Sequence, residues 1–234
     1  MSVSASAHRS VGVRVAAIIP ALDEERSIAA AVASLPSEIV DRVIVVDGGS
    51  RDATAVRAAD AGAEVLHEPR RGYGRACLSG VEAAAGAHVL LFMDGDGSDV
   101  GEQAHRLLEP ILCERADLVL GSRVRGRRER GSLAAHQIVG NRLVATILNR
   151  RFQLALTDIG PFRAIRAEVV LRLALREMTY GWPTEMIRNV ARDGGSVIEV
   201  PVDYRRRADG RSKVSGDLRA SARAGWNMLR VAAG

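Results

Sequence analysis

The chain has 234 residues, of which 47% are apolar and 26% charged, so it can bury a substantial core in one or two domains. No apolar run approaches the roughly 18 residues that span a bilayer, and residues 1–12 lack the apolar core of a signal peptide, so we expect a disordered tail there. The net charge of +5 is unevenly divided, because residues 1–122 hold 11 basic and 18 acidic side chains and residues 123–234 hold 22 and 10. The first half could therefore bind a cation. The second half could face phosphates, anionic lipid or nucleic acid, or form a solvated surface.

Strands and helices alternate through the first half of the chain. Short apolar runs predict strands at residues 13–19, 42–46, 64–67, 88–93 and 118–122, and helical patterns predict helices at 27–35, 53–61, 74–85 and 102–113. This alternation predicts βαβ units and a mostly parallel sheet. Ligands of such sheets bind beyond the carboxyl ends of the strands. Asp23, Asp47 and Asp94 each follow a strand, so we expect three carboxylates at one edge of the sheet.

The alternation ends after Ser122. The pattern then predicts a basic loop at 123–131, a helix at 133–150, a turn at 158–163 that leads into a short strand, helices at 167–175 and 184–192, and a strand at 197–200. A second basic loop at 203–215 precedes an amphipathic helix at 217–234. We expect residues 13–216 to form a single domain, followed by that helix.

Asp94-Gly95-Asp96 directly follows an apolar strand. Two carboxylates one residue apart on a turn can both bind one hard divalent cation, Mg²⁺ or Mn²⁺. Such a cation can bridge a diphosphate and neutralise the charge that grows on it as it leaves. The alternative is an ordinary Asp-Gly turn without a ligand.

Asp47 follows another strand and begins the segment Asp47-Gly48-Gly49-Ser50. An ionised carboxylate only accepts hydrogen bonds, so at a strand end it can receive the N–H groups of uracil or guanine. Glycine lets a base lie close to the backbone. Ser50 or Asp52 could also cap the following helix, which would leave Asp47 available.

The chain resembles the family 2 glycosyltransferases in four ordered segments: Ile18-Ile19-Pro20-Ala21-Leu22-Asp23-Glu24, residues 43–54 around Asp47, Gly72-Tyr73-Gly74-Arg75-Ala76 and Asp94-Gly95-Asp96. Later segments resemble the dolichyl- and polyprenyl-phosphate sugar synthase branch: Gly121-Ser122-Arg123, Asp158-Ile159-Gly160-Pro161-Phe162-Arg163-Ala164, Glu185-Met186, Glu199-Val200-Pro201-Val202 and Arg211-Ser212-Lys213. The resemblance covers residues 15–216 and implies the GT-A fold, a Rossmann-like, mostly parallel sheet flanked by helices, with a basic C-terminal acceptor-side half. It implies a nucleotide-sugar half at 13–122 and an acceptor half at 123–216.

The resemblance also implies roles for individual residues. The nucleotide-sugar site would comprise Pro20, Ala21, Asp23, Glu24, Asp47, Gly49, Gly72, Arg75, Asp94 and Gly95. Asp94 and Asp96 would bind Mg²⁺ or Mn²⁺, with Asp96 as the main ligand. The candidate catalytic residues are Asp96, Arg123, Asp158 and Glu185. Donor or acceptor phosphates would bind Arg123, Arg163, Arg207, Arg211, Ser212 and Lys213.

Several positions depart from the pattern of the family. Asp23 stands where the family usually has Asn, and Gly48 stands where it has a second Asp. Ser98 replaces the Gln that many synthases of the branch have, which argues against a third side-chain ligand for the metal. The family's Ser-Gly-Phe-Arg segment corresponds here to Ile159-Gly160-Pro161-Phe162-Arg163. We expect the rigid ring of Pro161 to change the shape of the acceptor-binding side of the site.

We expect an inverting transfer of a hexose from a nucleoside diphosphate sugar to a polyprenyl phosphate. A phosphate monoester is already ionised at neutral pH, so it needs basic groups to hold it but no general base. The alternative is a hydroxyl acceptor on a soluble molecule or glycan, for which Glu185 or Asp158 would be the base. If neither residue is a base, we expect Glu185 to stabilise a helix N-terminus and Asp158 to cap a turn. Thr184 and Glu185 stand where the family usually has a Glu-Asp pair, which favours the phosphate acceptor.

Two functions of other classes fit less well. A nucleotidyltransferase would need a Gly-rich loop with Lys or Arg after the first strand, where this chain is acidic. A nucleic-acid-binding module would need interleaved aromatic residues, and Tyr180, Trp182, Tyr204 and Trp226 form no such pattern. We therefore expect no nucleic-acid partner, and the sequence does not indicate an oligomeric state.

Cys77 and Cys113 lack metal-like spacing and fit buried thiols of a cytoplasmic protein. We expect the loop at 203–215 to close over the donor and acceptor phosphates. The helix at 217–234 would either lie on the anionic inner face of the cell membrane or pack against the core. The predicted location is thus the cytoplasm, with a peripheral membrane contact as an open alternative.

Overall fold

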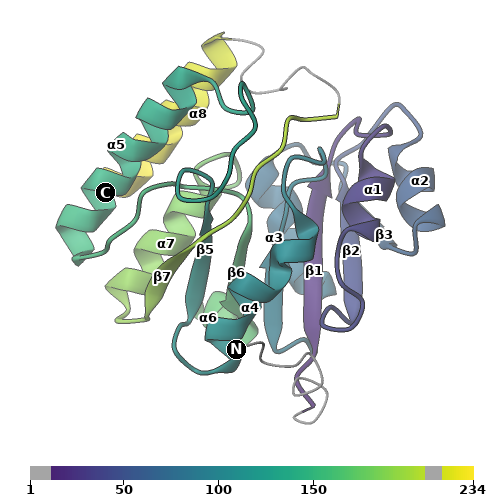
Figure 1. The fold of residues 1–234 in the computed structure, drawn as a ribbon, viewed down its shortest axis with the longest axis horizontal. Helices are drawn as coiled ribbons and strands as arrows, with labels where there is room; N and C mark the ends of the chain where they lie inside the picture. The colour runs from purple at the N-terminus through teal and green to yellow at the C-terminus, as the bar shows by residue number, and fades with distance from the viewer. Residues whose placement is uncertain (1–11, 209–217) are drawn as a thin grey trace.

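The computed structural model describes residues 12–208 and 218–234. Its strands are β1 (Val15–Ala21), β2 (Arg42–Asp47), β3 (Glu64–His67), β4 (Val89–Phe92), β5 (Leu118–Ser122), β6 (Arg163–Arg166) and β7 (Val197–Pro201). They form one sheet of seven strands in the order β3-β2-β1-β4-β6-β5-β7 (Figure 1). β6 is antiparallel to both of its neighbours, β4 and β5, whereas the other neighbouring strands are parallel. The predicted fold class, a mostly parallel α/β sheet flanked by helices, is confirmed.

Two predicted segments lie wholly or partly outside the described residues. They are the tail, of which residues 1–11 are not described, and the second basic loop, of which residues 209–217 with Arg211, Ser212 and Lys213 are not described. Within the described residues, none of the helices has the length and apolar character needed to cross a membrane. Cys77 is buried as expected, whereas Cys113 is exposed.

The strands β1, β4 and β5 are apolar and buried because helices cover both faces of the sheet there. In β1, Ala16 and Ile18 face one core, and Ala17 and Ile19 face the other. The strand continues through Pro20, where the sequence pattern had placed its end. Proline is tolerated there because the ladder with β4 ends at Ile18, so the missing N–H of Pro20 removes no pairing with that strand.

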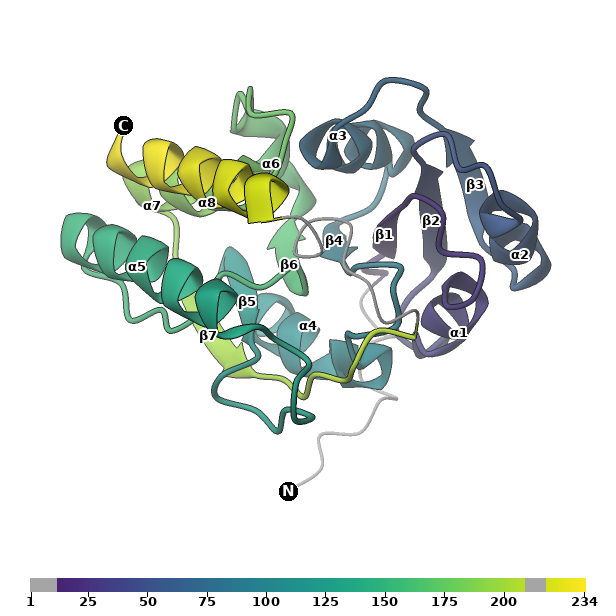
Figure 2. The same ribbon diagram turned by 90° about the horizontal axis from the view of Figure 1, so that it is seen from above.

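Helices cover the sheet in two layers (Figure 2). One core contains side chains of α1 (Ile28–Ala33), α2 (Thr54–Asp60) and α4 (Ala104–Leu112). The opposite core contains side chains of α3 (Tyr73–Ala83), α5 (Ala135–Phe152), α6 (Ala167–Arg172), α7 (Trp182–Arg192) and α8 (Leu218–Ala233). α8 lies beside α5 and α7 on the outside of this second layer (Figures 1 and 2).

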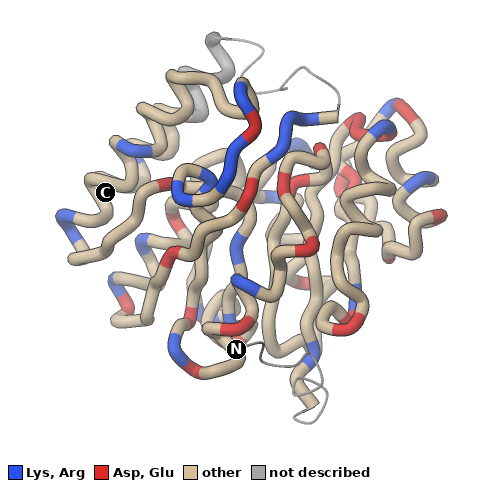
Figure 3. The backbone as a smooth tube through the Cα atoms, in the orientation of Figure 1, with Lys and Arg blue, Asp and Glu red and all other residues tan. Residues whose placement is uncertain are grey.

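The fold brings the two differently charged halves of the chain together. Since β1, β2 and β4 are parallel, the acidic residues that follow them lie at one edge of the sheet (Figure 3). β5 and β7 are parallel to each other, and the arginine-rich segments that follow them, 123–130 and 205–207, meet at the same edge (Figure 3). Acidic and basic groups therefore face one another where ligands of such sheets bind.

Candidate active site

Three carboxylates lie on the turn that follows β4. The backbone N–H of Asp94 donates to Oδ2 of Asp99 over 3.1 Å, and the N–H of Ser98 donates to Oδ1 of Asp96 over 2.9 Å. Gly97 has a φ of +76°, a left-handed conformation that suits glycine. The turn thus holds Asp94, Asp96 and Asp99 close together by its own hydrogen bonds.

The electrostatics of this turn favour a cation. Burial and then the charge of Asp96 raise the pKa of Asp94 to about 6. Burial and the charges of Asp94 and Asp96 raise the pKa of Asp99 well above its usual value. Asp99 Oδ1 is also buried without a hydrogen-bond partner. Negative charge is therefore only partly compensated here, although Arg207 Nε lies 3.0 Å from Asp96 Oδ2.

The carboxylates of this turn fit a hard divalent cation, because oxygen is the ligand that Mg²⁺ and Mn²⁺ prefer. Among the described residues, no group of three or more His, Cys, Asp or Glu side chains is placed to hold a metal ion. Ser98, at the position where many synthases of the branch have Gln, donates its backbone N–H to Asp96. Asp94 and Asp96 would therefore leave most coordination positions to water and a diphosphate.

The predicted nucleoside residues lie together at the ends of β1 and β2. Asp47 is 4% exposed, accepts a hydrogen bond from the Ser50 N–H over 3.2 Å, and has Oδ2 3.2 Å from Nδ1 of His67. Asp52 accepts from the Thr54 N–H over 3.0 Å, but the N-cap residue of α2, Ala53, has no side-chain cap, and Asp47 takes part in the turn through Ser50. Gly49, next to this network, has a φ of +84°.

The segment at 20–24 is joined to that turn by backbone hydrogen bonds. The Gly48 N–H donates to the carbonyl of Ala21, and the Asp23 N–H donates to Oγ of Ser50 over 2.9 Å. The Glu24 N–H donates to Oγ1 of Thr54, while Asp23 Oδ1 accepts from the Arg51 N–H. Pro20 and Gly95 lie next to this region, since Gly95 packs against Ala21. The structure thus brings all the predicted residues of the segment 20–24 close to Asp47.

Gly72 and Arg75 lie at the start of α3, against the segment that precedes α7. A Cβ atom on Gly72 would lie 2.3 Å from the carbonyl oxygen of Met178, and the Arg75 N–H donates to that same oxygen. This contact places Tyr73 in a stack with Tyr180, with ring centroids 6.0 Å apart. Burial and the charge of Asp94 raise the pKa of the Tyr73 hydroxyl.

Arg123 and Asp158 form a buried pair. Nε of Arg123 donates to Oδ2 of Asp158 over 2.7 Å, Nη2 donates to Oδ1 over 2.9 Å, and Asn141 donates to Oδ1 as well. Burial alone would raise the pKa of Asp158, but the charge and hydrogen bonds of Arg123 outweigh it and keep that pKa below its usual value. Asp158 is therefore a poor proton acceptor. The guanidinium of Arg123 also lies 5.1 Å from the ring centroid of Tyr204.

Glu185 holds a turn. It is 7% exposed, and its Oε2 accepts hydrogen bonds from the N–H groups of Arg176 and Glu177 over 3.0 and 2.8 Å. Arg188 lies 3.9 Å from its Oε1. This role differs from the predicted stabilisation of the helix N-terminus, because the carboxylate binds the segment before α7 and not the N–H groups of the helix itself.

Arg163 does not reach the site as a phosphate ligand would. It is 1% exposed, and its guanidinium donates to the carbonyls of Gly160, Pro161 and Pro183. Instead of the expected phosphate contact, the guanidinium of Arg163 connects the turn before β6 with the start of α7.

The segment after β7 crosses over the acidic turn. The Arg205 N–H donates to the Ser98 carbonyl over 2.8 Å, and the Ala208 N–H donates to the Asp96 carbonyl over 3.2 Å. These bonds place Arg207 on Asp96, so one predicted phosphate-binding residue lies at the carboxylate that was predicted to bind the metal.

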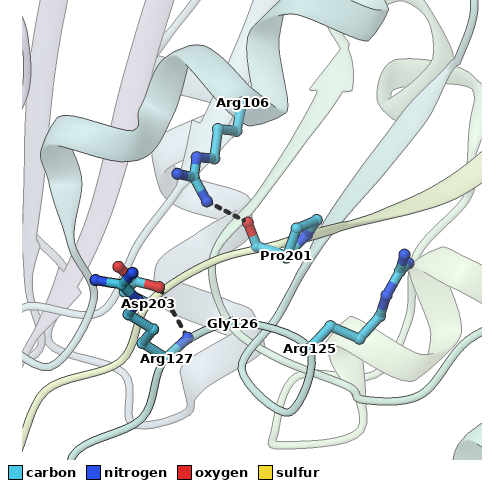
Figure 4. A pocket seen from close by; sticks show the side chains of 6 residues that line it. All are labelled: Arg106, Arg125, Gly126, Arg127, Pro201 and Asp203. Atoms are coloured by element: carbon cyan, nitrogen blue, oxygen red, sulfur yellow. Dashed lines mark hydrogen bonds between the residues drawn. The ribbon is translucent and has the colours of Figure 1, made fainter.

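A cavity of about 500 Å³ lies apart from these carboxylates, beside the β7 edge (Figure 4). Its lining residues are Arg106, Arg125, Gly126, Arg127, Pro201 and Asp203. One of its arginines, Arg106, donates to the carbonyl of Pro201 (Figure 4). Asp203 lies in this lining, whereas Tyr204, the next residue, contacts Arg123, so the extended segment separates the cavity from the candidate active site.

Sequence reasoning missed three residues of this site. Tyr73 was part of a recognised motif but had no predicted role, and Asp99 follows the Asp-Gly-Asp segment without belonging to it. Tyr180 had no sequence signal, because only the contact between α3 and the segment before α7 brings it to the carboxylates.

A mostly parallel sheet that gathers carboxylates and arginines at the ends of its strands is an architecture for binding phosphorylated ligands. Residues 16–173 match the family described as Glycosyl transferase family 2, and the chain belongs to this family. An uncharacterized glycosyltransferase of Mycobacterium tuberculosis is 38% identical over 215 residues, which cover 90% of this chain and 94% of that one.

Two further similarities concern the branch and the fold. An undecaprenyl-phosphate mannosyltransferase of Micrococcus luteus is 35% identical over 222 residues, which cover 88% of this chain and 89% of that protein. The predicted resemblance to the polyprenyl-phosphate sugar synthase branch is thereby confirmed. Glucosyl-3-phosphoglycerate synthase of Mycobacterium tuberculosis, solved with Mn²⁺, UDP-glucose and phosphoglyceric acid, has a TM-score of 0.77 at 21% identity, with 97% of this chain and 80% of that chain covered. This last similarity confirms the fold.

Proposed function

We propose that the chain transfers a hexose, with inversion, from a nucleoside diphosphate sugar to a polyprenyl phosphate. Residues 13–122 would bind the donor and residues 123–216 the acceptor. The observation that carries the choice of acceptor is the placement of the two candidate bases. Asp158 is paired with Arg123, and Glu185 is bound to two backbone N–H groups. A hydroxyl acceptor needs a base at this point, whereas an ionised phosphate does not.

The donor would lie along the edge of the sheet, from β2 to β4. Asp47, beside Pro20 and Ala21, would accept the N–H groups of the base, and Gly72 and Arg75 would border the nucleotide. A divalent cation on Asp94 and Asp96 would bridge the diphosphate and stabilise it as a leaving group. Through that cation, the carboxylates would hold the diphosphate end of the donor in place.

The acceptor phosphate would lie on the basic side of the site. Arg207 is the described residue that fits this role, because its guanidinium lies at the acidic turn and is 24% exposed. Arg211, Ser212 and Lys213 remain predicted partners of the phosphates. The relative from Micrococcus luteus supports a lipid phosphate as the acceptor.

The outer helices offer a surface for a membrane that carries such a lipid. Val139 and Leu143, one helical turn apart on α5, are 68% and 49% exposed, and Trp226 on the adjacent α8 is 68% exposed. Arg142 and Arg230, on the same two helices, are also exposed. Apolar side chains beside arginines suit the surface of an anionic bilayer, so we place the protein at the inner face of the membrane as a peripheral protein.

A matched pair of acceptors tests this function. Purified protein is incubated with Mg²⁺ or Mn²⁺, with UDP- or GDP-hexoses, and with either undecaprenyl phosphate or undecaprenol, and products are identified by mass spectrometry. We expect a hexosyl phosphate lipid from undecaprenyl phosphate and no product from undecaprenol. Transfer to the alcohol, or to soluble hydroxyl acceptors alone, would replace the proposed acceptor.

A further inference from the structure

Tyr180 is an exposed aromatic residue beside the acidic turn. Its side chain belongs to the segment before α7, and 39% of its surface remains open to solvent. Tyr73 stacks against it with an interplanar angle of 27°. Trp182, two residues further along, packs against Phe92 at the end of β4 with ring centroids 5.1 Å apart, so the segment that carries Tyr180 lies at the strand end that leads into Asp94. Burial and the charge of Asp94 raise the pKa of the Tyr180 hydroxyl, and the charge of Arg207 opposes them.

The position of this ring is fixed by the backbone around it. The carbonyl of Met178 accepts the Arg75 N–H, and Glu185 binds the two N–H groups just upstream. Thr179 donates its N–H to the carboxylate of Glu177, and Asn227 of α8 donates to the Thr179 hydroxyl. A side chain held this firmly loses little conformational entropy when a ligand stacks on it.

The order of strands shows which part of the donor would meet the ring. Asp47 ends β2, and Asp94 follows β4, two places along the sheet. The segment before α7 runs past the end of β4, because Tyr180 stacks on Tyr73 at the start of α3 and the start of α7 is bound to the turn before β6 through Arg163. With the base at Asp47 and the diphosphate at Asp94, the hexose at the end of the diphosphate would meet Tyr180.

We propose that Tyr180, backed by Tyr73, is a specificity-determining residue whose ring stacks on the apolar face of the hexose of the donor. This inference rests on the proposed function, since it requires a nucleotide sugar at Asp94 and Asp96. A hexose has a face of C–H groups and a rim of hydroxyls, and a tyrosine offers a matching apolar ring with a polar edge. A metal ion and the arginines would bind the phosphates of any nucleotide sugar, so they would not distinguish one hexose from another. We assign that discrimination to the ring of Tyr180.

The test compares each nucleotide with its sugar derivative. Calorimetry in Mg²⁺ measures the affinity for UDP and UDP-glucose, and for GDP and GDP-mannose, in the wild type and in Tyr180→Ala. We expect the substitution to weaken binding of the preferred nucleotide sugar about tenfold and binding of its free nucleoside diphosphate less than about twofold. Tyr180→Phe, which keeps the ring, should bind both as the wild type does. Leu171→Ala, which removes a 71% exposed apolar side chain on α6, is the control and should change neither affinity.

Two results would overturn the inference. If Tyr180→Ala weakened the nucleotide and the nucleotide sugar equally, the ring would serve the nucleotide and not the hexose. If it weakened binding of neither ligand, with the same melting temperature as the wild type, the ring would contact no part of the donor. A wild type that bound none of the four ligands would instead overturn the proposed function itself, so the two failures are distinguishable.

Discussion

The site consists of charged side chains whose roles depend on their partners and not on their types. Asp47 and Asp96, at strand ends, accept hydrogen bonds from Ser50 and Ser98 within their own turns, whereas Asp158 pairs with Arg123 and Glu185 binds the segment before α7. Carboxylates that look equivalent in the sequence therefore divide into candidate ligand-binding residues at strand ends and residues that hold distant segments together.

Asp47→Ala tests the nucleoside end. Loss of a charged acceptor should weaken binding of the preferred nucleoside diphosphate by about 1.5–3 kcal/mol. Calorimetry with UDP and GDP measures this. Glu64→Ala on the neighbouring β3, which removes an exposed carboxylate, is the control and should leave both affinities unchanged. Unchanged affinity in Asp47→Ala would remove this residue from the site.

Asp158→Asn tests the buried pair. It leaves the guanidinium of Arg123 buried without its counter-charge, so it should lower the free energy of unfolding by about 3–5 kcal/mol in urea denaturation. Asp193→Asn, in an exposed pair with Arg192, is the control and should cost at most about 1 kcal/mol.

The same pair gives a pH dependence with a definite sign. The pKa of Asp158 is lower in the folded protein than its ordinary 3.8. Its contribution to stability is therefore complete above about pH 4 and is lost as the pH falls through the folded-state pKa. The stability difference between the wild type and Asp158→Asn should shrink below pH 4. A difference that stayed constant down to pH 2 would contradict the assigned cause.

At the scale of the elements, the sequence predicted most strands and helices of the structure within a few residues. The strands at 64–67 and 118–122 match β3 and β5 fully, because short apolar runs bounded by turn residues leave little choice. The antiparallel placement of β6 between β4 and β5 could not be predicted, since periodicity does not encode strand order. For the same reason the contact between Tyr73 and Tyr180 and the carbonyl ligands of Arg163 appear only in three dimensions.

The contact between α3 and the segment before α7 depends on glycine. A Cβ on Gly74 would lie 2.4 Å from the Glu177 carbonyl oxygen and 2.8 Å from Cβ of Trp182. Gly74→Ala should therefore destabilise the protein by about 1–3 kcal/mol, as overpacking does. Gly140→Ala within α5, where nothing lies within 4 Å, should be neutral or stabilising by up to about 1 kcal/mol. Equal effects of the two substitutions in thermal unfolding would contradict this reading of the contact.

At the scale of the whole molecule, the sheet edge and the outer helices would serve one reaction at a membrane. Replacing Val139, Leu143 and Trp226 by Ser should lower binding to vesicles of anionic lipid about tenfold or more, because exposed apolar area is lost from two neighbouring helices. Vesicle sedimentation measures this, and nucleotide affinity should not change. Val56→Ser on α2, which is 62% exposed on the other layer, is the matched control.

The most direct measurement for the proposed reaction is the turnover of Glu185→Gln with undecaprenyl phosphate and the preferred nucleotide sugar. If the phosphate acceptor needs no base, the amide oxygen can still accept the N–H groups of Arg176 and Glu177, and kcat should fall less than about tenfold. Loss of a general base costs about 10²–10⁴-fold. A fall of that size, with nucleotide affinity and melting temperature intact, would show that Glu185 takes a proton in the reaction and would contradict transfer to an ionised phosphate.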